Sequence, residues 1–278
     1  MMQHDTPVAG ADDFAEKNRI YDTAAGALWR MAVYEPVHEG LEFTNMAGAP
    51  LLDLVATTYG TGEDTHVLDL CSGTGEVCRY LATRHGHTVT GIELNSAQLR
   101  HAVRRQRDLS PDVQRRIRIH QGDVTVWHPD RLYDLVLAVD SLTLLAEPER
   151  ALETAFDALV PGGHLILADI VAGATLTQRV REQVWDYDGI RPLPQAPATE
   201  ALLTGAGFRD PTGTDISDAA ITCFQKIRQA LRRRSREIKS VCEPAEYELW
   251  LTSTDFYLRS FSQGELTYWR YAAEHPRR

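Results

Sequence analysis

The stretch HVLDLCSGTGEV, from His66 to Val77, decides the fold. A short apolar run surrounds Asp69, and two glycines, Gly73 and Gly75, follow two residues apart. An apolar run of this length before a glycine-rich turn predicts a buried strand and a loop whose backbone approaches a ligand closely. A carboxylate at the end of such a strand repels a pyrophosphate and attracts a cation. We therefore predict that the turn binds a cationic ligand rather than a dinucleotide.

Strand-like and helix-like segments alternate along the chain beyond this turn. Their spacing is typical of parallel β-α units in a doubly wound sheet, so we predict an α/β fold. The expected strands are 66–70, 88–94, 116–123, 133–141, 164–171, 213–217 and 264–274. The expected helices between them are 76–86, 95–109, 147–163 and 198–208.

The 278 residues divide into three expected segments. Residues 1–17 are polar and acidic, so we expect a flexible N-terminus. Residues 18–60 are expected to be helical, with a loop between two helices. Residues 61–278 are expected to form the main domain, in which a mostly helical insertion at about 219–262 precedes the last strand.

The composition is that of an ordinary globular protein, with 43% hydrophobic and 24% charged residues. The longest apolar runs are only as long as strands, and the N-terminus lacks the basic start and apolar middle of a signal peptide. We therefore expect a cytoplasmic protein without a membrane partner. The net charge of −10 disfavours a nucleic-acid partner. Four cysteines without a C-x-x-C spacing predict free thiols and no metal site.

Further acids stand at the ends of the expected strands. Glu93, followed by Leu94, ends the second strand, where a carboxylate can accept hydrogen bonds from both hydroxyls of a ribose. Asp123 ends the third strand, where it could accept a hydrogen bond from an adenine amino group, with Val124 against the ring. Asp140 ends the fourth strand. Because parallel strands end at one edge of a sheet, we expect these acids around the same crevice as the glycine turn.

At these positions the sequence resembles the class I S-adenosylmethionine-dependent methyltransferases. The stretches that look like the family's motifs are LDLCSGTG (68–75), GIEL (91–94), QGDV (121–124), YDLVLAVDSL (133–142) and LVPGGHLILADI (159–170). Each motif is weak alone, but together and in order they make a specific match over about residues 60–210. The resemblance implies a Rossmann-like, seven-stranded, mostly parallel sheet whose last strand is antiparallel, and 264–274 would form that strand.

Within the class, the layout looks most like the small-molecule methyltransferases of sterol, prenyl-diphosphate and natural-product pathways. Tyr21 and the stretch VHEGLEF (37–43), with His38, look like the N-terminal segment that covers the site in those enzymes. There the tyrosine approaches the sulfonium of the cofactor. The helices at about 219–262 look like the cap over the site. Aromatic residues in the cap region could line a substrate pocket or pack in the cap core: Trp185, Tyr187, Phe224, Phe256 and Tyr257.

The sequence departs from the family pattern at several positions. Cys71 stands where the first glycine of the turn is commonest, and we expect a negative φ there, which any small residue tolerates. Many relatives carry histidines just after the fourth-strand acid, but residues 141–147 are SLTLLAE, so no histidine base is expected at that point. Cys78, with Cys223 and Cys242, could instead form the thiolate trio of arsenite methyltransferases. Buried free cysteines are the commoner outcome.

We therefore predict an S-adenosylmethionine-dependent methyltransferase that acts on a small molecule in secondary metabolism, such as antibiotic biosynthesis. The reaction would be in-line displacement at the sulfonium methyl. If a general base acts, the candidates in order are His38, Asp140 and Tyr21. The expected cofactor contacts are Tyr21, Asp69, Cys71, Gly73, Gly75, Glu93, Leu94, Asp123, Val124 and Asp140.

Other functions stay open at this point. An S-adenosylmethionine-binding cyclase, or another non-methylating enzyme on the same fold, would need the same pocket, and only the formation of S-adenosylhomocysteine separates the two. An NAD-dependent oxidoreductase would want Gly-x-Gly-x-x-Gly, but Cys78 occupies the last position. The sequence leaves open the substrate, the choice of N, O, S or C as the attacking atom, and the formation of a homodimer.

Overall fold

A seven-stranded sheet forms the centre of the computed structural model, which describes residues 33–60, 62, 64–190 and 193–277. The strand order is β3-β2-β1-β4-β5-β7-β6. Strand β7 runs antiparallel to β5 and β6, and the other neighbours pair in parallel, which confirms the expected fold class. The strands are β1 (His66–Leu70), β2 (Thr88–Glu93), β3 (Ile117–Gln121), β4 (Tyr133–Val139), β5 (Leu159–Ala172), β6 (Arg209–Asp215) and β7 (Leu266–Glu274).

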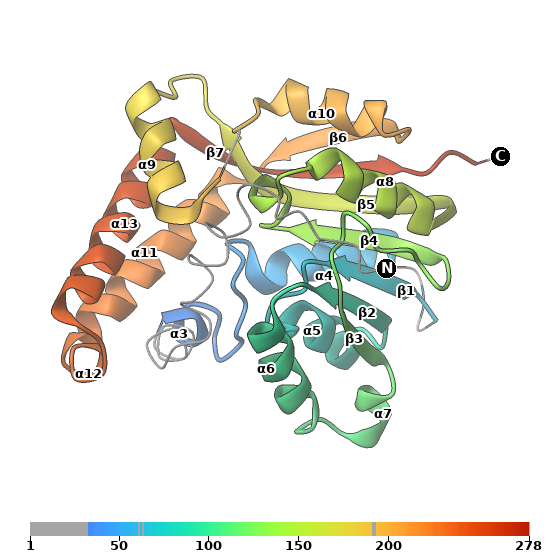
Figure 1. Ribbon diagram of the computed structural model, residues 1–278, viewed down its shortest axis with the longest axis horizontal. Coiled ribbons are helices and arrows are strands. Elements are labelled where there is room, and N and C mark those ends of the chain that lie inside the picture. The colour runs from blue at the N-terminus through green and yellow to red at the C-terminus, as the bar shows by residue number, and fades with distance from the viewer. Residues whose placement is uncertain (1–32, 61, 63, 191–192, 278) are drawn as a thin grey trace, which may run out of the picture.

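Helices cover both faces of this sheet (Figure 1). The helices are α3 (Glu35–Val37), α4 (Gly48–Tyr59), α5 (Glu76–Arg84), α6 (Ser96–Gln106), α7 (Pro111–Gln114), η3 (Leu142–Leu144), α8 (Pro148–Ala158), α9 (Gln178–Asp188), α10 (Ala196–Gly205), α11 (Ser217–Arg233), α12 (Ser235–Ile238) and α13 (Pro244–Ser262). Figure 1 shows α11 and α13 side by side at one end of the sheet. Among the described residues, no helix combines the length and the apolarity that a membrane span requires.

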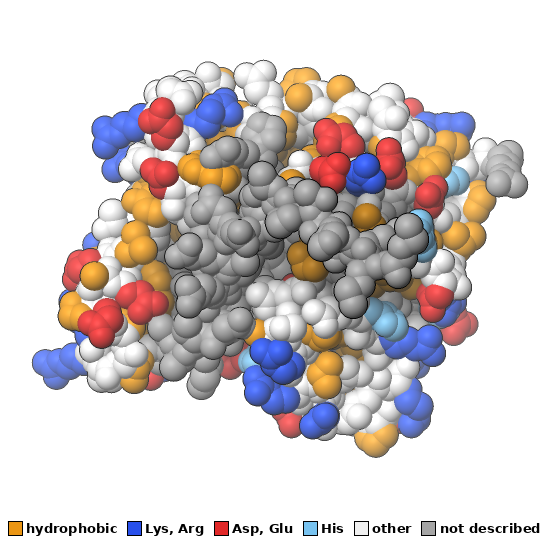
Figure 2. All heavy atoms as spheres, in the orientation of Figure 1, with side chains coloured by type: hydrophobic (Ala, Val, Ile, Leu, Met, Phe, Trp, Pro, Cys, Tyr) orange, Lys and Arg blue, Asp and Glu red, His pale blue; other side chains and the backbone are white. Residues whose placement is uncertain are grey.

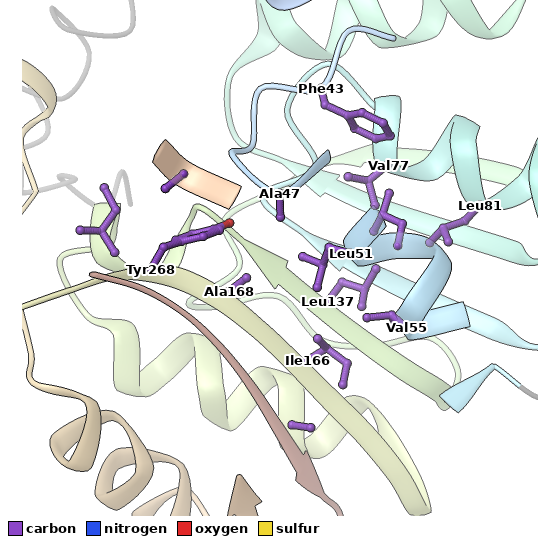
Figure 3. Close-up of a cluster of buried hydrophobic side chains, with 14 of the residues drawn as sticks. Phe43, Ala47, Leu51, Val55, Val77, Leu81, Leu137, Ile166, Ala168 and Tyr268 are labelled. Carbon is purple, nitrogen blue, oxygen red and sulfur yellow. The ribbon is translucent and has the colours of Figure 1, made fainter. Parts of the chain in front are cut away.

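The strand residues alternate between two buried clusters, as the period of a strand requires. Leu137 and Ile166 point to the face that α4 and α5 cover, where they lie in one cluster with Leu51 (Figure 3). Their neighbours point to the opposite face; Val136, for example, belongs to the cluster that includes Leu152 of α8. The sheet is therefore buried on both sides, which leaves the ends of its strands as the place for a site.

Some element boundaries differ from the expected ones. Helix α8 ends at Ala158, before the expected stop at Gly163, because residues 160–163 form an irregularity inside β5. Gly162 adopts φ +83 there. Helix α9 was not foreseen at all. The expected loop before α4 and the helical insertion before β7 are both present, whereas the predicted flexible N-terminus and most of the first helix of 18–60 lie outside the described residues.

Gly91 in β2 lies directly under the glycine turn, where there is no room for a larger side chain. A Cβ at Gly91 would lie 2.7 Å from Ser72 Oγ and 3.0 Å from Cys78 Sγ. We expect Gly91→Ala to lower the free energy of unfolding by about 1–3 kcal/mol, because overpacking of a buried site costs that much. Urea denaturation followed by circular dichroism measures the change. Gly205→Ala is the matched control, since no described atom lies within 4 Å of a Cβ there; an equal loss in both variants would contradict the packing argument.

Candidate functional site

The turn between β1 and α5 has the backbone conformation that its glycines allow. Gly73 has φ +56 and Gly75 has φ +73, and both values lie in the left-handed region that glycine adopts readily. A Cβ on Gly75 would also lie 2.8 Å from Ile119 Cδ1 and 2.9 Å from Ala102 Cβ. Glycine is therefore required at position 75 for the turn to pack against α6 and β3.

The expectation of a negative φ at Cys71 is wrong. Cys71 has φ +57, so this position of the turn adopts the left-handed conformation although it carries a side chain. This conformation costs a non-glycine residue roughly 1–2 kcal/mol, and such strain is concentrated at functional sites. Burial, followed by the nearby Glu93 and Asp69 carboxylates, raises the pKa of the Cys71 thiol, which therefore stays protonated at neutral pH.

A cavity lies between this turn and the segment that precedes α4. Asp69 and Cys71 line it from the turn, and Thr44 and Asn45 line it from the opposite side. The Asp69 side chain is buried, and Cys78 Sγ donates to its Oδ2 at 3.5 Å. Burial, with a smaller contribution from the nearby Glu93, raises the pKa of Asp69 to about 7. The cavity wall thus holds a carboxyl group that would gain from a cationic ligand.

Glu93 fastens the turn to the end of β2. Its Oε2 accepts a hydrogen bond from the Gly73 amide at 2.7 Å, and its Oε1 accepts one from the Asn95 amide at 2.7 Å. Asn95 in turn caps α6 by accepting from the Ala97 amide at 2.8 Å. Each carboxylate oxygen has a second lone pair, so both remain able to accept from a ligand. Leu94, the next residue, is 55% exposed beside this point.

Asp123 and Val124 differ in their surroundings. Asp123 is exposed, and its Oδ1 accepts hydrogen bonds from the Thr125 amide at 2.9 Å and the Thr125 hydroxyl at 2.7 Å. Val124 is buried and packs in the cluster that includes Ile92. The loop after β3 is therefore fixed by one exposed acid and one core residue, at the same sheet edge as Glu93.

Asp140 lies at the end of β4 with an uncommon backbone conformation, φ +51. Its Oδ2 accepts a hydrogen bond from the Met46 amide at 2.7 Å. Its Oδ1 is buried, and the Tyr268 hydroxyl acts on this carboxyl group as a hydrogen-bond donor. Burial, with a further contribution from Asp169, raises the pKa of Asp140 to about 8, although the hydrogen bond from Tyr268 acts to lower it.

Tyr268 of β7 is a residue that the sequence analysis missed. The side chain is fully buried, and its hydroxyl points toward Ala47 (Figure 3). This hydroxyl acts as a hydrogen-bond donor toward the Asp140 carboxyl group. Burial and then the Asp140 charge raise the pKa of Tyr268, so the two groups share one environment. No sequence signal distinguished Tyr268 from the other inward-facing residues of the last strand.

His38 lies beside the cavity rather than in its wall. Its ring stacks on Tyr34 with 6.5 Å between ring centroids and meets Phe43 edge-on at 5.7 Å. Burial, assisted by the charge of Lys226, lowers the pKa of His38 to about 4, so the imidazole is neutral at neutral pH. Tyr21, the third candidate base, lies outside the described residues.

The segment before α4 was expected as a loop, part of which (37–43) resembles a segment that covers the site in related enzymes, and it supplies part of the cavity wall. Asn45 Oδ1 accepts a hydrogen bond from the Gly48 amide at 2.6 Å, where α4 begins. An asparagine just before a helix is a known start signal, so the sequence did hold a sign of this structure. The resemblance of 37–43 pointed to the site, but the contacts of Thr44 and Asn45 with the cavity had no such sign, because they depend on tertiary packing.

The structure also shows where the cysteines of the possible thiolate trio and the aromatic residues of the cap region lie. Cys78 and Cys223 belong to different buried clusters, and within the described ranges no three His, Cys, Asp or Glu side chains are grouped as metal ligands. The cap aromatics pack on one another: Tyr187 lies 5.3 Å from Phe256, and Phe224 lies 5.1 Å from Tyr257, between ring centroids. These contacts place the aromatics in the core between α9, α11 and α13.

Known proteins share both the sequence pattern and the fold. A family model described as a methyltransferase domain matches residues 44–211. The 27-O-demethylrifamycin SV methyltransferase of Amycolatopsis mediterranei is 27% identical over 208 residues, which cover 72% of this chain and 75% of that protein. Phosphoethanolamine N-methyltransferase 2 of Haemonchus contortus, solved with phosphomonomethylethanolamine and S-adenosylhomocysteine, has a similar fold, with a TM-score of 0.81 and 18% identity.

That nematode structure matches 95% of this chain, but the chain spans only 60% of its length. A solved [4+2]-cyclase, SpnF, also has a similar fold, with a TM-score of 0.69 and 23% identity over 82% of this chain and 81% of that one.

The buried Asp69 makes the stability of the cofactor-free protein depend on pH. Its pKa is raised from 3.8 to about 7, so the folded chain holds the proton more tightly than the unfolded chain. The resulting stabilisation is complete below the ordinary pKa and is lost as the pH rises through about 7. We expect the free energy of unfolding in urea to fall between about pH 4 and about pH 7 and to level off above that, and Asp69→Asn to flatten that fall. Asp157→Asn, on the exposed side of α8, should leave it unchanged; an equally steep fall in Asp69→Asn would contradict this assignment.

Proposed function

The chain belongs to the family of methyltransferase domains, and we propose that it binds S-adenosylmethionine at the glycine turn and methylates a small molecule beside Asp140. It is an S-adenosylmethionine-dependent enzyme of the small-molecule branch. The observation that supports the proposed site best is the pair of buried carboxyl groups, Asp69 and Glu93, around the turn. Buried acids suit a ligand with a positive charge and hydroxyl donors, and they oppose the pyrophosphate of a dinucleotide.

The residues present fit this cofactor. We assign Glu93 to the ribose hydroxyls and Asp123 to the adenine amino group, and Asp69 to the positively charged part. The Ser72 hydroxyl is buried at the turn with no partner in the part of the chain that the structure describes, so it is available to a ligand. Leu94 and Val124 would supply apolar contacts beside the base. When bound, S-adenosylmethionine supplies a methyl group on a sulfur that is already activated for displacement.

The protein's own task is then to hold the acceptor in line and to exclude water. Phe43, Val77 and Val139 give the cavity apolar walls next to its carboxyl groups. A dry wall strengthens the interaction between a carboxylate and a cationic ligand, since the local dielectric is lower than in water. Alignment and electrostatics are sufficient for an acceptor that is already nucleophilic.

Where the acceptor must lose a proton, we place Asp140 first among the candidate bases. A pKa of about 8 suits proton transfer near neutral pH, whereas the pKa of about 4 makes His38 a weak base. Asp140 Oδ1 can accept a proton, and the Tyr268 hydroxyl can donate a hydrogen bond to a lone pair. A hydroxyl or a neutral amine offers this pair of groups both a proton and a lone pair, and an apolar carbon offers neither. Tyr21 stays a candidate from the family resemblance.

The wider setting belongs to the same proposal. We propose a cytoplasmic enzyme of secondary metabolism whose partner is a small molecule, without nucleic acid or membrane; a homodimer is left open. Residues 18–60 would cover the site and 61–278 would form the catalytic domain with its cap at about 219–262. The rifamycin relative and the phosphoethanolamine enzyme, by their names, methylate different atoms, so neither fixes the acceptor here.

A second candidate function is that of a cyclase, which would bind S-adenosylmethionine without transferring its methyl group. The similar fold of the [4+2]-cyclase SpnF favours this alternative. A cyclase would use the same pocket to hold and desolvate a substrate. Release of S-adenosylhomocysteine when a converted substrate is present separates the two functions, because only methyl transfer produces it.

Isothermal titration tests the cofactor site directly. We expect S-adenosylmethionine and S-adenosylhomocysteine to bind with micromolar affinity and NAD not to bind. Glu93→Ala should abolish binding, since it removes the ribose contact and releases the Gly73 amide. Glu153→Ala, on the exposed side of α8, is the control and should bind normally. Clear binding of NAD, or no adenosyl binding by the unmodified protein, would refute the proposal.

A further inference from the structure

Residues 41–47, here called the strap, connect α3 to α4 without forming helix or strand. Phe43, Thr44 and Asn45 of the strap line the cavity opposite the glycine turn. Phe43 is fully buried and meets Tyr80 of α5 at 5.4 Å between ring centroids. The shape of the proposed cofactor site therefore depends on where the strap lies, and not only on the family motifs.

Glu42 connects the strap to α6 through two cationic or potentially cationic side chains. Its Oε2 lies 2.6 Å from His101 Nε2, and its Oε1 lies 3.1 Å from Arg105 Nη1. The Glu42 side chain is only 3% exposed. Basic side chains gather over α6 in Figure 2, where Arg100 and Arg104 are exposed, while Arg105 reaches inward to the carboxylate. A carboxylate this deeply buried needs such partners to remain charged.

Glu42 also lies next to the glycine turn. The Thr74 hydroxyl donates to the Glu42 carbonyl oxygen at 3.4 Å. Arg105 Nη2 lies 3.9 Å from the Oε2 of Glu76, which lines the same cavity. At the other end of the strap, the Met46 amide donates to Asp140. The strap is thus held at one end by the acid that follows β4 and at the other by α6 and the turn.

A buried ion pair of this kind is weak evidence for stability. Apolar side chains of similar size often stabilise a protein as well or better, whereas charged groups accept only one arrangement of their partners. The Glu42 contacts join two segments that are 59 positions apart in the chain, at the edge of the cavity. The Glu42 contacts would therefore serve the site by fixing one position of the strap, rather than by stabilising the fold.

We propose that Glu42 is a positioning residue that, through His101 and Arg105, holds the strap closed over the bound cofactor. Glu42 itself does not contact the cofactor. Its effect is transmitted through the neighbouring Phe43, Thr44 and Asn45, which form the wall. The inference rests on the proposed cofactor site, and it predicts that Glu42 controls how fast the cofactor leaves.

Glu42→Gln tests the proposal, because it keeps the shape of the side chain and removes its charge. Radiolabelled S-adenosylmethionine is bound to the full chain and chased with excess unlabelled compound. We expect dissociation to become about tenfold faster, with a smaller change in association, as is usual when contacts around a bound ligand are weakened. Amide hydrogen exchange should rise in peptides that cover 41–47 and stay unchanged in peptides that cover β1. Glu147→Gln, which breaks an exposed pair with Arg150, is the matched control and should change neither.

The outcomes separate this inference from the proposed function. Failure of the unmodified chain to bind S-adenosylmethionine would refute the cofactor site, and the strap proposal with it. Normal binding by the unmodified chain, with the same dissociation rate and the same exchange in Glu42→Gln, would refute the strap proposal alone. If Glu42→Gln does not fold, His101→Phe tests the proposal instead, since it removes one partner of Glu42 and keeps the ion pair between Arg105 and Glu42. Faster dissociation in that variant supports the proposal, and an unchanged rate overturns it.

Discussion

The hydrogen bond from the Gly73 amide to the Glu93 carboxylate is the interaction on which the site depends. It joins the end of β2 to the turn after β1, and the second oxygen of Glu93 holds the start of α6 through Asn95. Two parallel strands and one helix are thereby set relative to one carboxylate. Because that carboxylate is buried, loss of either backbone donor would leave one of its oxygens without a hydrogen bond from the backbone amide that it now accepts from, which is costly. The turn therefore has one favourable position over the sheet edge.

The electrostatic character of the site follows from this geometry. Parallel strands deliver Asp69 and Asp140 to the same edge, and burial raises the pKa of both. A row of carboxyl groups in a low dielectric can become charged only where a positive charge or hydrogen-bond donors compensate it. A cofactor with a sulfonium and a ribose offers both. The same fold with a neutral turn would suit a dinucleotide, so the strand-end residues, and not the sheet, decide the ligand.

The sequence was sufficient for the sheet and for the acids at its edge, because periodicity and parallel connections place strand ends together. It was insufficient wherever a position depends on contacts between distant segments. The positive φ of Cys71 is a feature of the folded turn, and the chemistry of cysteine gives no hint of it. Tyr268 has the same pattern as any inward residue of β7, and only the first residues of the strap, 41–43, lie in a stretch that resembles a family segment. The positions of both depend on contacts between distant parts of the chain.

The division between these two parts has a physical reason. A shared cofactor can be bound by a fixed set of strand ends, and those ends carry readable motifs. In the proposed site the acceptor would contact the segment before the sheet, the cap and β7, which can change without disturbing the strand order. Here the halves meet at Asp140, which ends β4 and accepts the Met46 amide of the strap. A change in the strap therefore reaches the acceptor side through Asp140 as well as the cofactor side through Glu42.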